Sequence, residues 1–325
     1  MRCEVSSMPL SPEVDPVSGQ FCQQCAEPVG HRDRYCEHCG SWVADLRRDR
    51  VELKVGTAAG ISDRGRRRHR NEDALALRDI GLDFDTGSGS TQRGVAVAIV
   101  CDGVSSSDRP DEASETAAET AAETLVAALC AEDHPAAATR DAIHAADRAV
   151  AQLAGASGAD NSAPACTFVS AIVTGDEVTV GWVGDSRAYW IPQEHTDTAP
   201  TRLTTDDSWL TQVLAAGTMS SAQAAADRRA HAITAWLGED ADQVEPHVVT
   251  IEPEGPGVVV ICTDGLWNYF DTVEELSEAL PEDALEAPLD AARWLVELAL
   301  LRGGHDNVTV AVVPFVNRPA IGTST

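Results

Sequence analysis

Five aspartates in this 325-residue sequence lie next to runs of apolar residues. Asp102 follows VAVAIVC, Asp264 follows VVVICT, and Asp185 follows VTVGWVG. Asp306 precedes VTVAVV, and Asp73 precedes ALALR. Because short apolar runs bounded by Gly, Pro or Asp are typical of strands, we expect neighbouring strands to bring these carboxylates together at one end of a sheet.

Carboxylates gathered in this way favour metal chemistry. A buried cluster of like charges costs free energy unless a cation neutralises it. Oxygen ligands select hard divalent cations such as Mg²⁺ or Mn²⁺. Gly103 follows Asp102 and Gly265 follows Asp264, so the backbone can turn sharply there and offer a carbonyl oxygen as well. One Asp-Gly pair alone is usually a turn, but five aspartates in this pattern predict a divalent-cation site.

A second possible metal site lies near the N-terminus, where two CxxC pairs are separated by ten residues. Zn²⁺ takes four thiolates in a tetrahedron, and each CxxC turn can aim two of them at one point. A redox pair or disulfides are the alternatives, and His31 or His38 could replace a cysteine. The paired motifs favour a zinc ribbon with a structural or protein-docking role. The predicted ligands of one Zn²⁺ are Cys22, Cys25, Cys36 and Cys39.

Composition is that of a soluble globular protein, with 43% hydrophobic and 23% charged residues. No apolar run is long enough to span a membrane, and the start lacks a signal pattern, so a cytoplasmic location is expected. The net charge of −28 argues against nucleic acid as a partner. Residues 64–70 are the exception, because they contain five arginines. Such a run is usually a solvated basic loop, but here it immediately precedes Asp73.

The apolar patterning divides the chain into a small N-terminal part and one large domain. We expect a disordered segment at 1–19, the zinc ribbon at 20–42, a linker at 43–54, the large domain at 55–314 and a loose tail at 315–325. Short strands and helices alternate in the large domain, and the strands look antiparallel, which favours stacked sheets flanked by helices. The clearest helices are expected at 111–131, 136–154, 206–217, 272–280 and 288–301.

The ordered motifs RRRHRNEDA, VCDGV, GDSRAYW, TDGLWN and GGHDNVTV resemble those of the type 2C, metal-dependent (PPM) protein phosphatases of bacteria. The resemblance covers about residues 55–314, and LTTDDSWLTQVLAAGTMSSAQA is similar to the segment that leads into a flap beside the active site in bacterial members. It implies an α+β fold, a four-layer αββα sandwich of two antiparallel sheets flanked by helix pairs. It also implies hydrolysis of phosphoserine and phosphothreonine in proteins, with a cognate serine/threonine kinase as a possible partner.

The resemblance also assigns roles to residues. Two Mn²⁺ or Mg²⁺ ions would be bound by Asp73, Asp102, Asp264, Asp306 and the carbonyl of Gly103. Asp185 would join Asp264 at a third, weaker site. Glu72 would orient metal-bound water, Arg68 would bind phosphate, and Asn307 would support Asp306. A hydroxide bridging two cations would attack phosphorus in line, while the cations and Arg68 stabilise charge on the phosphoryl oxygens.

One loop departs from the resemblance. Many relatives have Met or His and then paired glycines after the Asp-Gly motif, whereas this chain has Val104 followed by Ser105, Ser106 and Ser107. Val104 cannot act as a general acid, so a leaving group would take its proton from water or from another group. The alternative to an active enzyme is a catalytically weak phosphatase fold that acts as a scaffold through its zinc ribbon.

Overall fold

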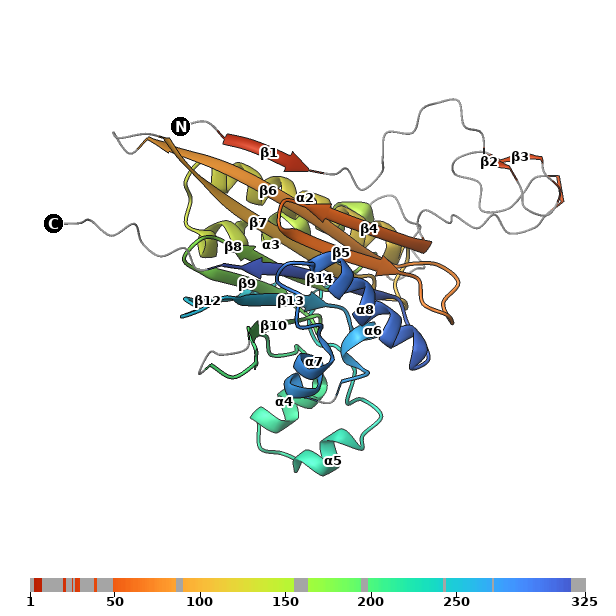
Figure 1. Ribbon diagram of the computed structural model, residues 1–325. Helices are drawn as coiled ribbons and strands as arrows, with labels where there is room; N and C mark the ends of the chain where they lie inside the picture. The colour runs from red at the N-terminus through yellow and green to blue at the C-terminus, as the bar shows by residue number, and fades with distance from the viewer. Residues whose placement is uncertain are drawn as a thin grey trace.

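Two antiparallel sheets lie face to face in the computed structural model, with helices on their outer faces (Figure 1). The described residues are 3–7, 20–21, 25, 27–29, 38–39, 49–85, 90–154, 163–193, 198–241, 244–270 and 272–316. In them the first sheet has the order β1 (Cys3–Ser7), β6 (Asp73–Asp85), β7 (Ser90–Asp102), β8 (Phe168–Val173), β9 (Val178–Val183), β12 (His247–Ile251). The second has the order β11 (Thr201–Arg202), β10 (Arg187–Pro192), β13 (Gly257–Cys262), β14 (Val308–Phe315), β5 (Ala58–Asp63), β4 (Arg50–Val55).

The central strands β8, β9, β13 and β14 are buried on both faces, which explains their nearly continuous apolar sequences. In β6, Ala74 and Ala76 point to the helix-covered face, whereas Leu75 and Leu77 point to the other sheet. The same alternation runs through β7, because successive side chains of a strand leave opposite faces. The core between the sheets therefore forms without any helix residue among its buried members.

Helices close both outer faces. The helices are α2 (Pro110–Cys130), α3 (Pro135–Ala154), α4 (Trp209–Ala215), α5 (Ser221–Ala225), α6 (Asp264–Trp267), α7 (Val273–Ala279) and α8 (Pro288–Leu301). Helices α2 and α3 cover the first sheet mainly with alanines such as Ala117 and Ala121, and these small side chains let the helices approach the sheet closely. Helices α6, α7 and α8 bury residues such as Leu295 against the second sheet.

This architecture confirms the expected αββα sandwich. The five expected helices occur within a few residues of their predicted bounds. Two boundaries of the large domain were wrong. Residues 50–54 belong to β4 rather than to a linker, because β4 pairs with β5 along its whole length. Phe315, expected in the tail, is a fully buried member of β14.

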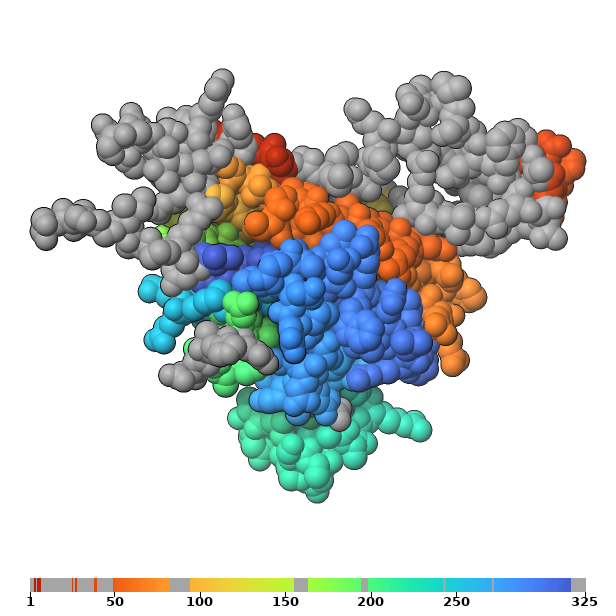
Figure 2. All heavy atoms as spheres, viewed as in Figure 1, coloured from red at the N-terminus to blue at the C-terminus, as the bar shows by residue number. Residues whose placement is uncertain are grey.

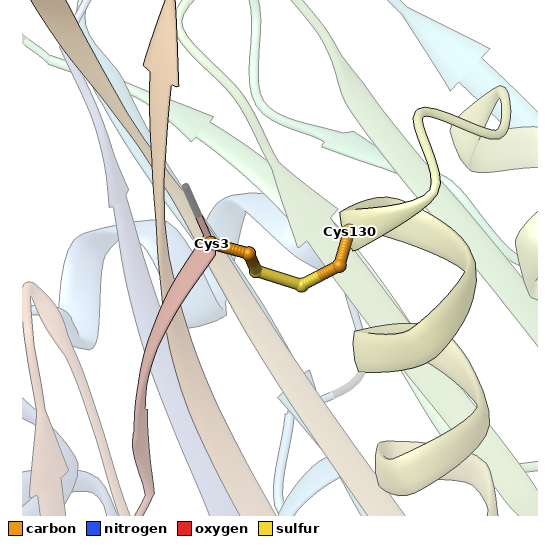
Figure 3. The surroundings of a disulfide bond; sticks show 2 residues. All are labelled: Cys3 and Cys130. Carbon is orange, nitrogen blue, oxygen red and sulfur yellow. A yellow bond between two sulfur atoms is a disulfide. The ribbon is translucent and has the colours of Figure 1, made fainter. Parts of the chain in front are cut away.

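The N-terminal strand is a further correction. Residues 3–7, expected to be disordered, form β1 and pair antiparallel with the edge of β6, where Cys3 lies opposite Leu82. Cys3 is joined to Cys130 at the end of α2 by a disulfide, with a Cα–Cα distance of 5.8 Å (Figure 3). The composition of residues 1–19 does not reveal this strand. Its pairing depends on the edge of β6, and its cross-link depends on a residue 127 positions away.

The proposed zinc ribbon lies largely outside the described residues. Strands β2 (Gln20–Phe21) and β3 (Pro28–Val29) pair there, and Cys25 lies between them in the chain. Cys22 and Cys36 are not described, whereas Cys25 is half-buried and Cys39 exposed. In the described part of the chain, no helix has the length and apolar character needed to cross a membrane.

Candidate active site

The strand register brings the five aspartates to one end of the sandwich. Asp73 begins β6 and lies directly opposite Asp102 at the end of β7. Asp264 begins α6 just after β13, and Asp306 lies just before β14, the strand that pairs with β13. Asp185 lies in the turn between β9 and β10. We call these five residues the acidic cluster.

Burial and mutual repulsion dominate the electrostatics of the acidic cluster. Burial raises the pKa of Asp102 well above its ordinary value, and the charges of Asp73 and Asp264 raise it further. Burial likewise raises the pKa of Asp73 to about 7. The pKa of Asp185 is raised to about 7 and that of Asp264 to about 6, again chiefly by burial. Carboxyl groups in this situation need protons or cations to offset their charge.

Two carboxylate oxygens of the cluster are buried without any hydrogen-bond partner, Oδ1 of Asp73 and Oδ1 of Asp264. The other oxygen of Asp73 accepts hydrogen bonds from Thr309 Oγ1 at 2.7 Å and Thr263 Oγ1 at 3.0 Å. Buried polar atoms are nearly always paired, so a buried, unpaired oxygen in an acidic cluster is the donor that a hard cation requires. These observations fit divalent cations.

The carboxylates of the acidic cluster are not yet arranged as the ligands of a metal ion. Among the residues that the structure describes, no group of three His, Cys, Asp or Glu side chains is arranged closely enough to hold a metal ion. Instead, the Asp306 carboxylate accepts a hydrogen bond from Arg68 Nη2 at 2.6 Å. A bound cation would therefore have to draw the carboxylates closer together.

Arg68 is the centre of a short polar chain at the edge of the cluster. Its Nη1 donates to Ser105 Oγ at 2.9 Å, and Ser105 Oγ donates to Glu72 Oε2 at 2.7 Å. Arg70 Nε donates to the other oxygen of Glu72 at 2.8 Å. The Glu72 carboxylate is thus held from two sides, and the Arg68 guanidinium is held beside Asp306 while remaining about one third exposed.

Asn307 fastens the loop that carries these groups. Its Nδ2 donates to the carbonyls of Arg64 and Arg70 at 2.8 and 2.9 Å, and its Oδ1 accepts from the Glu72 N–H at 2.8 Å. The Asn307 N–H donates to Asp306 Oδ1 at 2.9 Å. The buried Asn307 side chain therefore positions the arginine-rich loop, while its main-chain N–H holds the Asp306 carboxylate.

The two glycines of the Asp-Gly pairs are required by close approach rather than by a left-handed turn. A Cβ on Gly265 would lie 1.8 Å from the Asn307 carbonyl oxygen. A Cβ on Gly103 would lie 2.4 Å from the Pro110 carbonyl oxygen. Both glycines thus let neighbouring backbone segments pack directly beside the acidic cluster.

Three hydroxyl groups at this site were not predicted from the sequence motifs. Ser105 joins Arg68 to Glu72, although it stands in the loop that departs from the family pattern. Thr263 and Thr309 both donate to Asp73. A usable signal existed for the two threonines, because each is a lone polar residue next to an aspartate motif in an otherwise apolar run.

A tryptophan links the acidic cluster to the segment that is expected to lead into a flap. Trp267 Nε1 donates to the Asp185 carbonyl at 2.9 Å. The Arg187 guanidinium lies 3.6 Å from the centre of the Trp267 ring, and it also makes two hydrogen bonds to Asp206 at the start of that segment. Helices α4 and α5 of the segment project away from the sandwich (Figure 1).

Comparison with known proteins agrees with this fold. The family model for protein phosphatase 2C matches residues 71–297. The chain is 28% identical over 261 residues to the serine/threonine phosphatase stp of Listeria monocytogenes, covering 78% of this chain and 93% of that protein. The crystal structure of the Mycobacterium tuberculosis serine/threonine phosphatase PstP/Ppp is 25% identical, with a TM-score of 0.58, and the match covers 82% of this chain and all of that one.

A second solved structure, the catalytic domain of the serine threonine protein phosphatase PstP in complex with two manganese ions, is 26% identical with a TM-score of 0.55. That match covers 79% of this chain and 97% of the other. The stacked sheets and the acidic cluster define a phosphatase of the metal-dependent class. The chain belongs to the protein phosphatase 2C family.

Proposed function

We propose that this chain removes phosphate from phosphoserine and phosphothreonine in proteins, and that the acidic cluster is its reaction centre. The observation that carries the proposal is the convergence of five carboxylates, two of them with buried unpaired oxygens, beside an arginine. Membership of the protein phosphatase 2C family and the similarity to serine/threonine phosphatases support it.

Two Mn²⁺ or Mg²⁺ ions are the proposed cofactors, and a third would be weaker. The proposed ligands of the first two ions are Asp73, Asp102, Asp264, Asp306 and the Gly103 carbonyl. Asp185 and Asp264 would serve the third. When bound, such cations supply Lewis acidity, which lowers the pKa of water and offsets negative charge on a phosphoryl group.

The residues around the cluster have distinct proposed tasks. The exposed part of the Arg68 guanidinium would bind phosphoryl oxygens through its planar fork, in place of part of its contact with Asp306. Glu72, fixed by Ser105 and Arg70, would accept a hydrogen bond from the attacking water and orient it. Asn307 would hold Asp306 in position. Val104 offers no proton, so the leaving alkoxide would take its proton from water or from another group.

The test of this function is phosphate release from phosphothreonine, phosphoserine and phosphotyrosine peptides of one sequence, with Mn²⁺ or with chelator. We expect release from the first two peptides with Mn²⁺, and little from the third. Rapid release in chelator, or a preference for phosphotyrosine, would contradict the proposal. The scaffold alternative is not favoured, because each aspartate of the expected metal site is present at the same end of the fold.

We further propose that Cys22, Cys25, Cys36 and Cys39 bind one Zn²⁺ in a ribbon at residues 20–42. The β2–β3 pair around Cys25 supports it, because a short hairpin is the usual frame of a CxxC turn. Metal analysis of the purified chain should find one Zn²⁺ per molecule, and Cys25→Ser with Cys39→Ser should remove it. An unchanged zinc content in that variant would exclude this ligand set. The cytoplasmic location and the cognate kinase also stay predictions.

A further inference from the structure

Two segments far apart in the sequence form one surface beside the acidic cluster. The Arg66 N–H donates to the Gly304 carbonyl at 2.8 Å, which joins the arginine-rich loop to the loop after α8. Gly65 permits this close approach of the two loops, because a Cβ there would lie 2.0 Å from the Asp306 carbonyl oxygen. Figure 2 shows the orange residues of the first loop against the blue residues around the end of α8.

The arginines of this surface fall into two groups. Arg64 pairs with Asp49 at 3.1 Å, Arg68 pairs with Asp306, and Arg70 pairs with Glu72. Arg66 and Arg67 are exposed, and within the described ranges neither makes an ion pair. Carboxylates of the site and Asp49 thus neutralise the three inner arginines and leave Arg66 and Arg67 available.

The second loop adds a third exposed guanidinium. Arg302 lies over the Phe270 ring at 4.6 Å and donates to the Tyr269 carbonyl. Among the residues described, no carboxylate pairs with it. These contacts hold the guanidinium in place without neutralising its charge. We call Arg66, Arg67 and Arg302 the basic rim.

We propose that the basic rim binds acidic side chains that flank the phosphorylated residue, and so selects phosphoproteins with acidic sequences around the target serine or threonine. This inference rests on the proposed function and extends it to the substrate class. The observation behind it is a group of unpaired positive charges next to the reaction centre of a chain whose net charge is −28. The rest of the protein surface is negatively charged and repels acidic partners, whereas the basic rim attracts them locally.

Position in the chain favours a peptide over other anionic partners. Arg66 and Arg67 stand two and one residues before Arg68, the proposed phosphate ligand. Two residues of extended chain span at most about 7 Å. An extended substrate that places its phosphate at Arg68 would therefore bring side chains about two to four residues away to the rim. Three arginines in so acidic a protein are too few for a nucleic-acid surface.

The experiment compares two phosphothreonine peptides, one flanked by glutamates and one by glutamines, with the full chain, the Arg66→Gln/Arg67→Gln variant and a control. The control is Arg140→Gln/Arg148→Gln, which removes equal charge from exposed positions on α3. The readouts are the ratio of kcat/KM for the two peptides at low and high salt, and peptide binding by fluorescence anisotropy. Hydrolysis of para-nitrophenyl phosphate reports on the reaction centre separately.

The wild type and the control should prefer the acidic peptide. At low salt, the ratio of kcat/KM for the acidic peptide to that for the neutral peptide should be about fivefold lower in the rim variant. High salt should reduce the preference of the wild type towards that of the variant. The same preference in the rim variant and the wild type would overturn the proposal, as would no preference in the wild type. If no protein hydrolyses any substrate, the proposed function fails, and the anisotropy comparison still decides whether the rim binds acidic peptides.

Discussion

The Asp102→Asn variant is expected to lose about a thousandfold in kcat/KM for a phosphothreonine peptide assayed with Mn²⁺. Asp102 is the member of the acidic cluster that all four other aspartates influence electrostatically. An amide at this position would weaken cation binding. The transition state would then lose several kcal/mol of charge stabilisation. Steady-state kinetics over a range of Mn²⁺ concentrations would measure the loss.

The same variant should be more stable than the wild type when cations are removed. Neutralising Asp102 relieves like-charge repulsion and the cost of a buried charge, so the melting temperature in chelator should rise by about 2–6 °C. Asp79→Asn is the matched control, because Asp79 lies on β6 with Asp73 but outside the cluster. That control should keep activity within about twofold. If the Asp102→Asn protein were instead destabilised or unfolded, misfolding would explain its loss of activity.

The stability of the cation-free protein is expected to fall as the pH rises from about 5 to 8. The folded pKa of Asp73 is raised from 3.8 to about 7, and that of Asp185 likewise, mainly by burial. Between these values the folded chain holds protons that the unfolded chain has released, so the free energy of unfolding decreases with pH. For one such group the loss between pH 5 and pH 8 amounts to about 3 kcal/mol, at 1.36 kcal/mol per pKa unit.

Mn²⁺ should oppose this trend, because cation binding requires deprotonated carboxylates and strengthens as the pH rises. Urea unfolding at pH 5.5 and pH 8, in chelator and in Mn²⁺, would measure both effects. The expected result is a stabilisation by Mn²⁺ that is small at pH 5.5 and larger by several kcal/mol at pH 8. A cation-free protein that is more stable at pH 8 than at pH 5.5 would show that the aspartates are not buried together.

The fold was predictable because its main signals are local. Apolar runs marked the strands, and helical spacing marked α2, α3 and α8, so the layers followed from patterning. Strand β1 was missed because nothing within residues 3–7 shows that β6 offers an open edge. The domain boundary before Val55 was missed although its signal is local, because β4 (RVELKV) alternates charged and apolar residues and pairs with β5, the next strand in the chain.

The candidate site shows the same division. The aspartates stand out because a charge at the end of an apolar run is unusual, and the register indeed places Asp73 opposite Asp102. The role of Ser105 was not predictable, because its two partners come from another loop. Likewise, the separation of inner, paired arginines from the basic rim depends on which carboxylates the fold brings to residues 64–70.

The central claim is that the acidic cluster binds the cations on which phosphate release depends. Its most direct test is calorimetric titration of Mn²⁺ into the chelator-treated chain and into Asp102→Asn, with phosphate release measured on the same samples. The wild type should bind about two more ions than the variant, and its activity should rise in step with their binding. Equal Mn²⁺ binding by the two proteins, or full phosphatase activity without a divalent cation, would contradict it.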